Sequence, residues 1–412
     1  SGALAPENLS QLQAEPIELD YQRLGGQFGP APYLRAQVKS SLEDILEEAP
    51  GGPFNLYSDG LKITLSVNAQ MQEYAEEAVK KHMKKLQKSF ESHWKGQKPW
   101  GNDWSFLWKK AKTSVRYQRL AAQGKSQKEI EEIFKTPTRL SIYTHNGLES
   151  ATMSPLDSVA YHQMILHTGF LAMDAENGHV LAYVGGIDFG HFPYDHIYSR
   201  RQVGSTFKPF VYATALEAGI SPCDFIENEP IIFSNYEDWS PQNADGKYGG
   251  FYTVKGGLAN SVNTVAARLV AETGPGSVAD MARRLGIRSK LPEVPALALG
   301  VADISLEEMV SAYSAFSNTG EKVEPVYILK IETSEGGLIY EAEKPKPEEV
   351  LKKETAQNMR SMLEMVVDSG TARSLRSVYG VSIDVGGKTG TTQDNADRSE
   401  ERRVGKECAT GC

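Results

Sequence analysis

The stretch Gly204-Ser-Thr-Phe-Lys-Pro-Phe210 sets a serine and a lysine three positions apart at the expected start of a helix. Mostly apolar residues follow and stop at Gly219, which predicts a buried helix closed by a glycine. Pro209 has no backbone N–H and is tolerated only in the first turn, so the helix should begin near Ser205. Residues three apart on a helix share a face, so Ser205 and Lys208 should lie within reach of each other.

A neighbouring serine and lysine can carry out nucleophilic chemistry. A serine hydroxyl needs an adjacent base, and Lys208 can be that base only in its neutral form. Burial and a nearby positive charge, for which Lys388 is the candidate, would lower its pKa far enough. The spacing alone is weak support, because Ser92 and Lys95 share it without a helix start. A helix cap followed by a solvated lysine is the alternative interpretation of Ser205.

A second motif, Ser261-Val-Asn263, precedes an apolar run at 265–270 that is typical of a helix. The Ser261 hydroxyl would stand between Lys208 and a leaving group, and the Asn263 amide would bind a substrate peptide group. The structural alternative is a helix N-cap, with Asn260, Ser261 and Asn263 competing for that role.

A third motif, Lys388-Thr-Gly-Thr391, follows alternating apolar residues at 381–385, which predict a strand. The Gly386-Gly387 pair before it permits close backbone approach. In such a strand the last threonine N–H would donate to an oxyanion, while the lysine ammonium and the threonine hydroxyls bind a carboxylate. The candidate binding residues are therefore Lys388, Thr389, Gly390 and Thr391.

Neither a nucleotide nor a metal is expected. Gly387-Lys-Thr389 matches the end of a phosphate-binding loop, but Ser382 stands where that motif requires glycine. The eight histidines show no metal-ligand spacing. A net charge of −9 argues against a nucleic-acid partner. No apolar run is long enough to predict a transmembrane helix within the chain.

In this order, the three motifs resemble those of the penicillin-binding transpeptidase family. Their wider context is similar to the class A proteins of the 1A type over Arg201–Phe210, Gly257–Asn263 and Gly387–Thr392. The blocks Ala298–Gly320 and Val366–Ala372 are similar to the same domain. The resemblance implies an α+β fold like that of the serine β-lactamases, with an antiparallel sheet flanked by helices and here truncated after the Lys-Thr-Gly strand.

The resemblance also implies a D,D-transpeptidase that cross-links peptidoglycan without a cofactor. Ser205 would attack the carbonyl between two D-alanines, Lys208 would take its proton, and Ser261 would relay a proton to the departing D-alanine. Asn263 and the motif at 388–391 would bind the substrate. An amine of a neighbouring stem peptide would resolve the acyl-enzyme, and β-lactam antibiotics would acylate the same serine. Cell-wall synthesis proteins would be partners, at the extracytoplasmic (periplasmic) face of the bacterial cytoplasmic membrane.

Two other function classes stay open at this point. A D,D-carboxypeptidase or a β-lactamase would resolve the acyl-enzyme with water, and some serine β-lactamases use an extra positioned Glu for that step. No such Glu is identifiable in this sequence. A non-catalytic penicillin-binding sensor or scaffold is the second alternative, and the complete set of motifs argues against it.

Four parts are expected along the chain. Residues 1–55 form an interdomain linker after a membrane-anchored glycosyltransferase domain that the family implies upstream, and 56–150 form a linker or accessory domain. Residues 151–397 form the transpeptidase domain, without the terminal strands and helix of the family. The charged segment 398–412 looks like a non-native tail.

Local signals predict several elements inside these parts. They are a helix near 33–46, a strand at 61–67 followed by a helix capped by Asn68, and a β-hairpin over 169–184. Ser305 and Glu308 form a capping box. Helices mixed with hairpins in this way predict an α+β fold.

The region 80–112 is rich in lysine and tryptophan. It would either bind a partner or form a helical face with its tryptophans inward and its lysines outward. The second interpretation is favoured.

Overall fold

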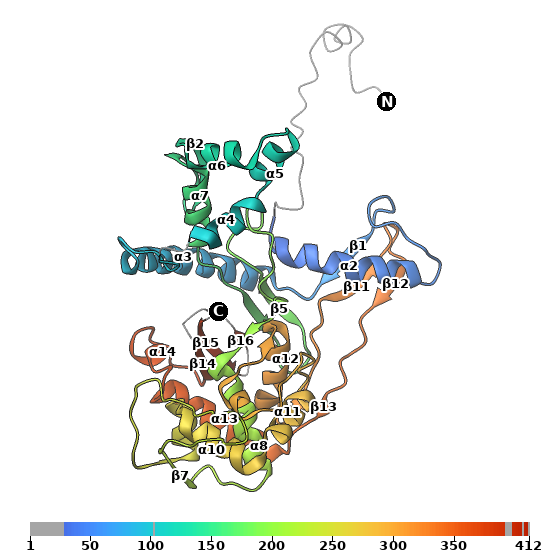
Figure 1. Cartoon of the computed structure of the whole chain (residues 1–412). Helices are drawn as coiled ribbons and strands as arrows, with labels where there is room; N and C mark the ends of the chain where they lie inside the picture. Colours follow the sequence, from blue (N-terminus) through green and yellow to red (C-terminus); the bar gives the residue numbers. More distant parts are fainter. Residues whose placement is uncertain (1–28, 102–103, 392–397, 406–407, 411–412) are drawn as a thin grey trace, which may run out of the picture.

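The computed structural model describes residues 29–101, 104–391, 398–405 and 408–410 (Figure 1). The helices are α2 (Pro32–Glu48), α3 (Ala69–His93), α4 (Trp104–Lys112), α5 (Val115–Ala122), α6 (Gln127–Lys135), α7 (Pro155–Gln163), η2 (Gly204–Phe207), α8 (Lys208–Glu217), α9 (Val254–Ala259), α10 (Asn263–Thr273), α11 (Pro275–Arg284), η3 (Pro295–Leu299), α12 (Leu306–Ser317), α13 (Lys353–Asp368) and α14 (Ser374–Ser377). The strands are β1 (Lys62–Leu65), β2 (Thr138–Thr144), β3 (Gly147–Met153), β4 (Phe170–Met173), β5 (Val180–Val184), β6 (Arg201–Gln202), β7 (Phe225–Glu227), β8 (Phe251–Thr253), β9 (Asp303–Ile304), β10 (Glu321–Lys322), β11 (Ile328–Glu332), β12 (Leu338–Glu341), β13 (Glu348–Glu349), β14 (Gly386–Thr391), β15 (Arg398–Gly405) and β16 (Cys408–Thr410).

Helix α8 is the centre of the larger hydrophobic core. Its residues from Lys208 to Ala215 are all buried, because α10, α11 and α13 pack around it. Figure 1 shows α8, α10, α11 and α13 gathered at one end of the molecule. A helix without a solvent-facing side is normally apolar all round, as Phe210 and Val211 are here. The one lysine in this stretch is therefore a polar group held in a dry interior.

An antiparallel sheet lies against this helical core. β14 pairs with β15, and β15 pairs with β16. β16 lies beside β4, which forms the predicted hairpin with β5. Helix α12 packs against β4 and β15, and α13 packs against β14. The predicted α+β arrangement of an antiparallel sheet with helices against it is confirmed.

Two strands follow the Lys-Thr-Gly strand in this sheet, and the truncation of the domain relative to its family stays a prediction. Thr391 pairs with Arg398 and Gly386 pairs with Val404. An open strand edge presents N–H and C=O groups with which a segment of any sequence can pair. The charged composition of this segment therefore did not exclude strands. The non-native origin of residues 398–412 stays a prediction.

A second small sheet joins the N-terminal part to the rest of the chain. β1 pairs with β11 and β11 with β12, and Ile63 lies opposite Ile331. Helix α2 packs against β5, where the buried Tyr33 donates its hydroxyl hydrogen to Phe192 O at 2.6 Å. A Cβ on Gly186 would lie 2.3 Å from that hydroxyl, so the contact requires glycine. Segments on both sides of the predicted boundary at residue 150 thus share contacts.

Helices α4 to α7 surround a separate small core, and strand β2 contacts α7. Leu107 and Phe134 are buried at its centre. Trp100 and Trp108 pack against that centre, whereas 42% of Trp104 is exposed. The predicted inward orientation thus holds for Trp100 and Trp108 and is wrong for Trp104.

The predicted helix starts are confirmed at two places. Asn68 Oδ1 accepts a hydrogen bond from Met71 N at 3.0 Å and caps α3. Ser305 and Glu308 form the capping box of α12. Among the described residues, no helix is both long enough and apolar enough to cross a bilayer.

The strand predicted at 381–385 is wrong, because β14 begins only at Gly386. Arg376 Nη1 donates to Val381 O at 2.8 Å and to Ile383 O at 2.6 Å. The carbonyl groups that a strand would offer to its neighbour are thus used by a side chain. The apolar alternation there leads into the strand without belonging to it.

Candidate active site

Ser205 lies in the short 3-10 turn η2, which leads directly into α8 at Lys208. Pro209 follows in the first turn of α8, where its missing N–H costs no helical bond. The predicted helix start near Ser205 is confirmed. Gly204 has a φ of 54° and donates its N–H to Gly300 O at 3.0 Å. A Cβ on Gly300 would lie 2.0 Å from Gly204 O, so the turn is pressed against a position that only glycine can occupy.

The same turn is held from helix α12. The buried Tyr313 donates its hydroxyl hydrogen to Thr206 O at 2.6 Å. Because this bond fixes the backbone next to Ser205, α12 acts as a support for the nucleophile candidate. The sequence placed Tyr313 in an apolar helix but carried no signal for the partner of its hydroxyl.

Lys208 is fully buried, and its side-chain nitrogen reaches the second motif. Nζ lies 2.5 Å from Ser261 O, 2.6 Å from Asn263 Oδ1 and 3.2 Å from Ser261 Oγ. These contacts, rather than one to Ser205, are its described hydrogen bonds. The predicted encounter of the first two motifs thus occurs through Lys208.

Lys388 approaches the same serine from β14. It is also fully buried, and its Nζ lies 2.8 Å from Ser261 Oγ and 2.9 Å from Thr389 O. The hydroxyl of Ser261 therefore stands between two lysine side chains that come from a helix and from a strand. β14 also packs against η2, which carries Ser205.

Both lysines have lowered pKa values. Burial lowers the pKa of Lys388 to about 7. Burial, and secondly the positive charge of Lys388, lowers the pKa of Lys208 well below its ordinary value. No described ion pair joins either amine to a carboxylate, so only hydrogen bonds to neutral oxygens oppose the effect of desolvation. Burial and the neighbouring Lys388 thus favour the neutral amine form of Lys208.

A neutral Lys208 amine has two N–H donors and one lone pair. Ser261 O and Asn263 Oδ1 lie at the two shortest distances and accept these two donors. The lone pair is then left for a hydroxyl proton. This is the arrangement that a general base beside a serine requires.

Ser261 has an unusual backbone conformation. Its φ is 55°, in the left-handed region that non-glycine residues seldom occupy. The N-cap of α10 is Val262, so the structure does not support an N-cap role for Ser261. Local strain of this kind persists where the surroundings impose it and is frequent at functional sites.

The third motif lies along β14, with its two threonines at the more accessible positions. Lys388 and Gly390 are buried, Thr389 is half-buried and Thr391 is exposed. The Thr389 hydroxyl lies 2.7 Å from Thr371 Oγ1. A carboxylate could therefore reach the threonine hydroxyls beside the buried Lys388 amine. Thr371 was not singled out from the sequence, because its partner is distant along the chain.

The competing Ser92 lies elsewhere. It is exposed near the end of α3, and its hydroxyl donates to Lys88 O at 2.9 Å within the same helix. That bond is typical of an ordinary helical serine. The shared Ser-x-x-Lys spacing therefore has no matching site around it.

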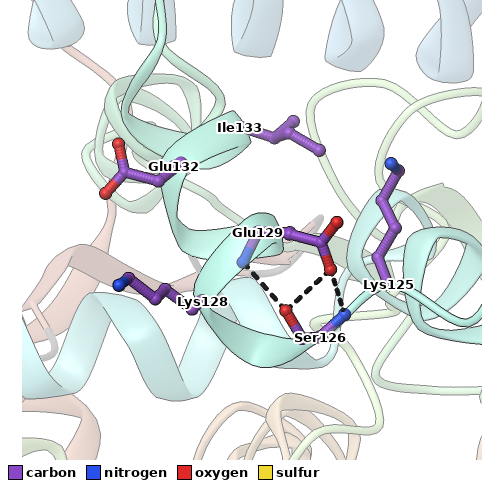
Figure 2. Close-up of a pocket in the computed structure, with 6 residues that line it drawn as sticks. All are labelled: Lys125, Ser126, Lys128, Glu129, Glu132 and Ile133. Atoms are coloured by element: carbon purple, nitrogen blue, oxygen red, sulfur yellow. Dashed lines mark hydrogen bonds between the residues drawn. The ribbon is translucent and has the colours of Figure 1, made fainter.

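A shallow surface hollow lies beside the start of α6 (Figure 2). It is lined by Lys125, Ser126, Lys128, Glu129, Glu132 and Ile133. Figure 2 shows Ser126 and Glu129 bonded to each other as a helix capping box, which accounts for their polar atoms. Since α6 and β14 lie in different regions of Figure 1, the hollow does not belong to the lysine site. Among the described residues, no group of three or more His, Cys, Asp or Glu side chains could hold a metal.

Two family matches cover most of the chain. Residues 168–410 match the penicillin binding protein transpeptidase domain, and residues 92–166 match the penicillin-binding protein middle domain. The first match spans more than half of the 412 residues and contains all three motifs.

Curated relatives agree with these matches. Penicillin-binding protein 1A of Neisseria lactamica is 36% identical over 243 residues, which cover 57% of this chain and 30% of that protein. Penicillin-binding protein 1A of Rickettsia felis is 28% identical over 418 residues, which cover 89% of this chain and 52% of that protein. The chain thus spans between about a third and about half of the length of these relatives.

Solved structures share the fold. Penicillin-binding protein 1A from Haemophilus influenzae has a TM-score of 0.72 at 21% identity, covering 99% of this chain and 68% of that chain. PonA1 from Mycobacterium tuberculosis, in complex with penicillin V, has a TM-score of 0.62 at 20% identity, covering 93% of this chain and 84% of that chain.

Proposed function

This chain belongs to the penicillin-binding protein transpeptidase domain family, and from that premise we propose that it is a D,D-transpeptidase that cross-links peptidoglycan stem peptides through a serine acyl-enzyme. The observation that carries the proposal is the position of Ser261 Oγ between Lys208 and Lys388. β-Lactam antibiotics would acylate the same serine because they mimic the D-alanyl-D-alanine end of the stem peptide.

In the first step the Ser205 oxygen attacks the carbonyl carbon between the two D-alanines. Lys208 takes the hydroxyl proton on its free lone pair and becomes an ammonium. The N–H groups of Ser205, at the entry to α8, and of Thr391, at the end of β14, are the candidate donors to the oxyanion. Their elements pack against each other, which supports this pairing.

In the second step the tetrahedral intermediate collapses and the peptide C–N bond breaks. The departing D-alanine nitrogen needs a proton, which Ser261 gives to it while taking one from the Lys208 ammonium. The distance of 3.2 Å between Lys208 Nζ and Ser261 Oγ supports this relay. Lys388, at 2.8 Å from the same oxygen, stabilises the hydroxyl while it exchanges protons.

Binding of the terminal carboxylate would fall to Lys388 and the threonines Thr389 and Thr391. An anion next to Lys388 favours the ammonium form, so substrate binding would raise the pKa of Lys388. The amide of Asn263 is assigned to the peptide group of the donor strand. Resolution of the acyl-enzyme by the amine of a second stem peptide completes the cross-link.

A fluorescent penicillin tests the covalent step. We expect peptide mapping to find the label on Ser205 and expect Ser205→Ala to abolish it. Ser92→Ala is the matched control, because Ser92 has the same spacing to a lysine, and it should label normally. Label that persists in Ser205→Ala would refute the assignment.

A second measurement separates the transpeptidase from the other two classes. With a stem-peptide donor and an amine acceptor, a transpeptidase forms the cross-linked dimer. A carboxypeptidase or a β-lactamase-type hydrolase would release D-alanine or hydrolysed antibiotic without a dimer. A sensor or scaffold would bind penicillin and turn over neither peptide.

The location and partners of the protein follow from this function. By resemblance to the penicillin-binding proteins, we place the domain at the extracytoplasmic face of the bacterial cytoplasmic membrane. Other cell-wall synthesis proteins are the expected partners, and a membrane anchor is expected upstream of this segment.

A further inference from the structure

Helix α10 begins without a cap of its own. Its N-cap residue is Val262, whose side chain cannot accept a hydrogen bond, and the first N–H groups of a helix need acceptors from elsewhere. Asn243, in the loop between β7 and β8, supplies one. Its Oδ1 accepts from Asn263 N at 3.0 Å and from Thr264 N at 3.2 Å. The cap of this helix therefore comes from a distant loop and contacts the residue that reaches Lys208.

Asn243 is fixed in turn by a buried group of polar side chains. Its Nδ2 donates to Asn228 Oδ1 at 2.7 Å and to Lys247 O at 2.8 Å. The Thr264 hydroxyl donates to the same Asn228 oxygen at 2.7 Å. Asn228, Asn243 and Thr264 are all buried, so each lost hydrogen bond would leave an unpaired polar atom. With Nδ2 facing two acceptors and Oδ1 facing two N–H donors, the Asn243 amide has one favourable orientation.

The residue before Asn243 sets the orientation of the Asn263 amide. Gln242 O accepts from Asn263 Nδ2 at 2.6 Å, and this leaves Asn263 Oδ1 facing Lys208 Nζ at 2.6 Å. If the amide were turned over, an N–H group would face the lysine and an oxygen would face the Gln242 carbonyl. The contact between the two oxygens would then be unfavourable, and the N–H group could bond only to the lone pair that the base needs. The position of the loop backbone thus decides which atom Lys208 meets.

We propose that Asn243 is a positioning residue, which holds the start of α10 and the Gln242 carbonyl so that Asn263 presents its oxygen to Lys208. The proposal rests on the proposed function for the meaning of that contact. Asn263 Oδ1 takes one N–H direction of the neutral Lys208 amine and so aims the lone pair away from it. Asn243 itself does not touch the reacting atoms. Its effect reaches the chemistry through Asn263.

The contact between Asn263 Oδ1 and Lys208 Nζ affects the pKa of Lys208. An acceptor at 2.6 Å stabilises the ammonium form more than the amine, so its loss lowers the pKa of Lys208. Lys388 on β14 is the charged group that acts on Lys208, and no substitution in the loop alters it. A change in the titration of Lys208 would therefore report on Asn263.

The test compares Asn243→Leu with Val270→Ala. Leucine has a similar size and makes no hydrogen bond, whereas Val270→Ala opens a cavity in the buried face of the same helix away from the loop. We expect Asn243→Leu to lower the pKa of Lys208, followed through its labelled Nζ by NMR, by about one unit. The rate constant of penicillin acylation should fall roughly tenfold, with the dissociation constant changed less than about twofold.

The rising limb of the pH profile of acylation should move to lower pH in Asn243→Leu. Val270→Ala should lose stability while it keeps the wild-type titration and acylation rate. If Asn243→Leu does not fold, the isosteric Thr264→Val removes one anchor of Asn228 and should produce the same changes at a smaller scale. The proposal would be overturned if Asn243→Leu and Thr264→Val showed the same Lys208 titration and the same acylation rate as Val270→Ala. A wild-type chain that penicillin does not acylate would refute the proposed function instead, and the NMR titration would still decide the role of Asn243.

Discussion

In the part of the chain that the structure describes, two buried lysines without a carboxylate partner share one serine hydroxyl. Such a pair is costly, because both amines are removed from water and the charge of Lys388 disfavours a charge on Lys208. The site therefore favours neutral amines, and a neutral amine is what activation of Ser205 needs. A carboxylate that enters next to Lys388 would restore one charge without recharging the base. Burial of the two amines thus both destabilises the fold and favours the neutral amine that the proposed activation of Ser205 uses.

Replacement of Lys388 by methionine should raise the stability of the fold and slow acylation by penicillin. Burial lowers the pKa of Lys388 from 10.5 to about 7, so the unfolded chain binds more protons between these values and stability rises with pH across that window. The loss of folding stability caused by burying Lys388 is complete below pH 7 and absent above about pH 10.5. Lys388→Met should therefore raise the free energy of unfolding at pH 7 by roughly 3–5 kcal/mol and flatten its pH dependence. Urea denaturation at several pH values measures both.

The same variant should acylate more slowly. A charge-assisted hydrogen bond contributes about 1.5–3 kcal/mol, so we expect a loss of roughly ten- to a hundredfold in penicillin acylation. Lys353→Met, at the exposed start of α13, is the control and should change neither property. A Lys388→Met chain that is less stable than wild type at pH 7 would contradict the prediction.

At the scale of elements, helix α12 is the support whose anchoring can be tested. Glu308 at its start is buried and accepts from Ser289 N at 2.7 Å, from Ser289 Oγ at 2.8 Å and from Ser305 Oγ at 2.9 Å. Burial would raise the pKa of this carboxyl, but the hydrogen bonds from Ser289 and Ser305 outweigh burial and hold it below the ordinary value. The same helix carries Tyr313, which holds the turn of the nucleophile candidate.

Glu308→Gln should therefore destabilise the protein by about 2–4 kcal/mol, because an amide N–H₂ replaces an acceptor among donors. A carboxyl with a lowered pKa stabilises the fold above its unfolded pKa and loses that effect as the pH falls through the folded value. The variant should therefore be less sensitive to acid than the wild type. Thermal unfolding from pH 7 to pH 3 measures this, with Glu354→Gln in the exposed first turn of α13 as control. Equal acid sensitivity of both chains would disprove the assignment.

Local elements were predictable where the signal lies within one turn of the chain. The helix start at Ser205, the Asn68 cap and the capping box of α12 each depend on residues three or four positions apart. The strand before Gly386 was misjudged, because the Arg376 guanidinium competes for its carbonyl groups. The cap from Asn243 was invisible for a similar reason, since it acts across the fold. Motif order pointed to the candidate residues of the site. Their meeting in space depends on contacts that no short sequence pattern records.

At the scale of the whole molecule, Tyr33 joins helix α2 to the part of the chain that carries the three motifs. Its ring packs edge-on against Phe189 at 5.0 Å, and its hydroxyl bonds to Phe192 O. Tyr33→Ala should cost about 3–5 kcal/mol and expose α2 to proteases, because the cavity cannot close around the glycines of the 185–186 turn. Tyr33→Phe keeps the ring and should cost only about 1 kcal/mol. Limited proteolysis with denaturant unfolding measures both, and equal losses in the two variants would contradict a packing role.

The pairing of β1 with β11 also has a consequence for synthesis on the ribosome. Lys62 pairs with Glu332, so the first strand of this sheet must wait for a partner that is made much later. At about 5–20 residues per second, the delay is on the order of 15–50 s. During that interval β1 has an unpaired edge and an uncovered apolar side. The nascent chain is therefore most exposed to misassociation and to chaperone capture before Ile328–Glu332 leaves the exit tunnel, and slowing translation between these two segments should prolong that exposure.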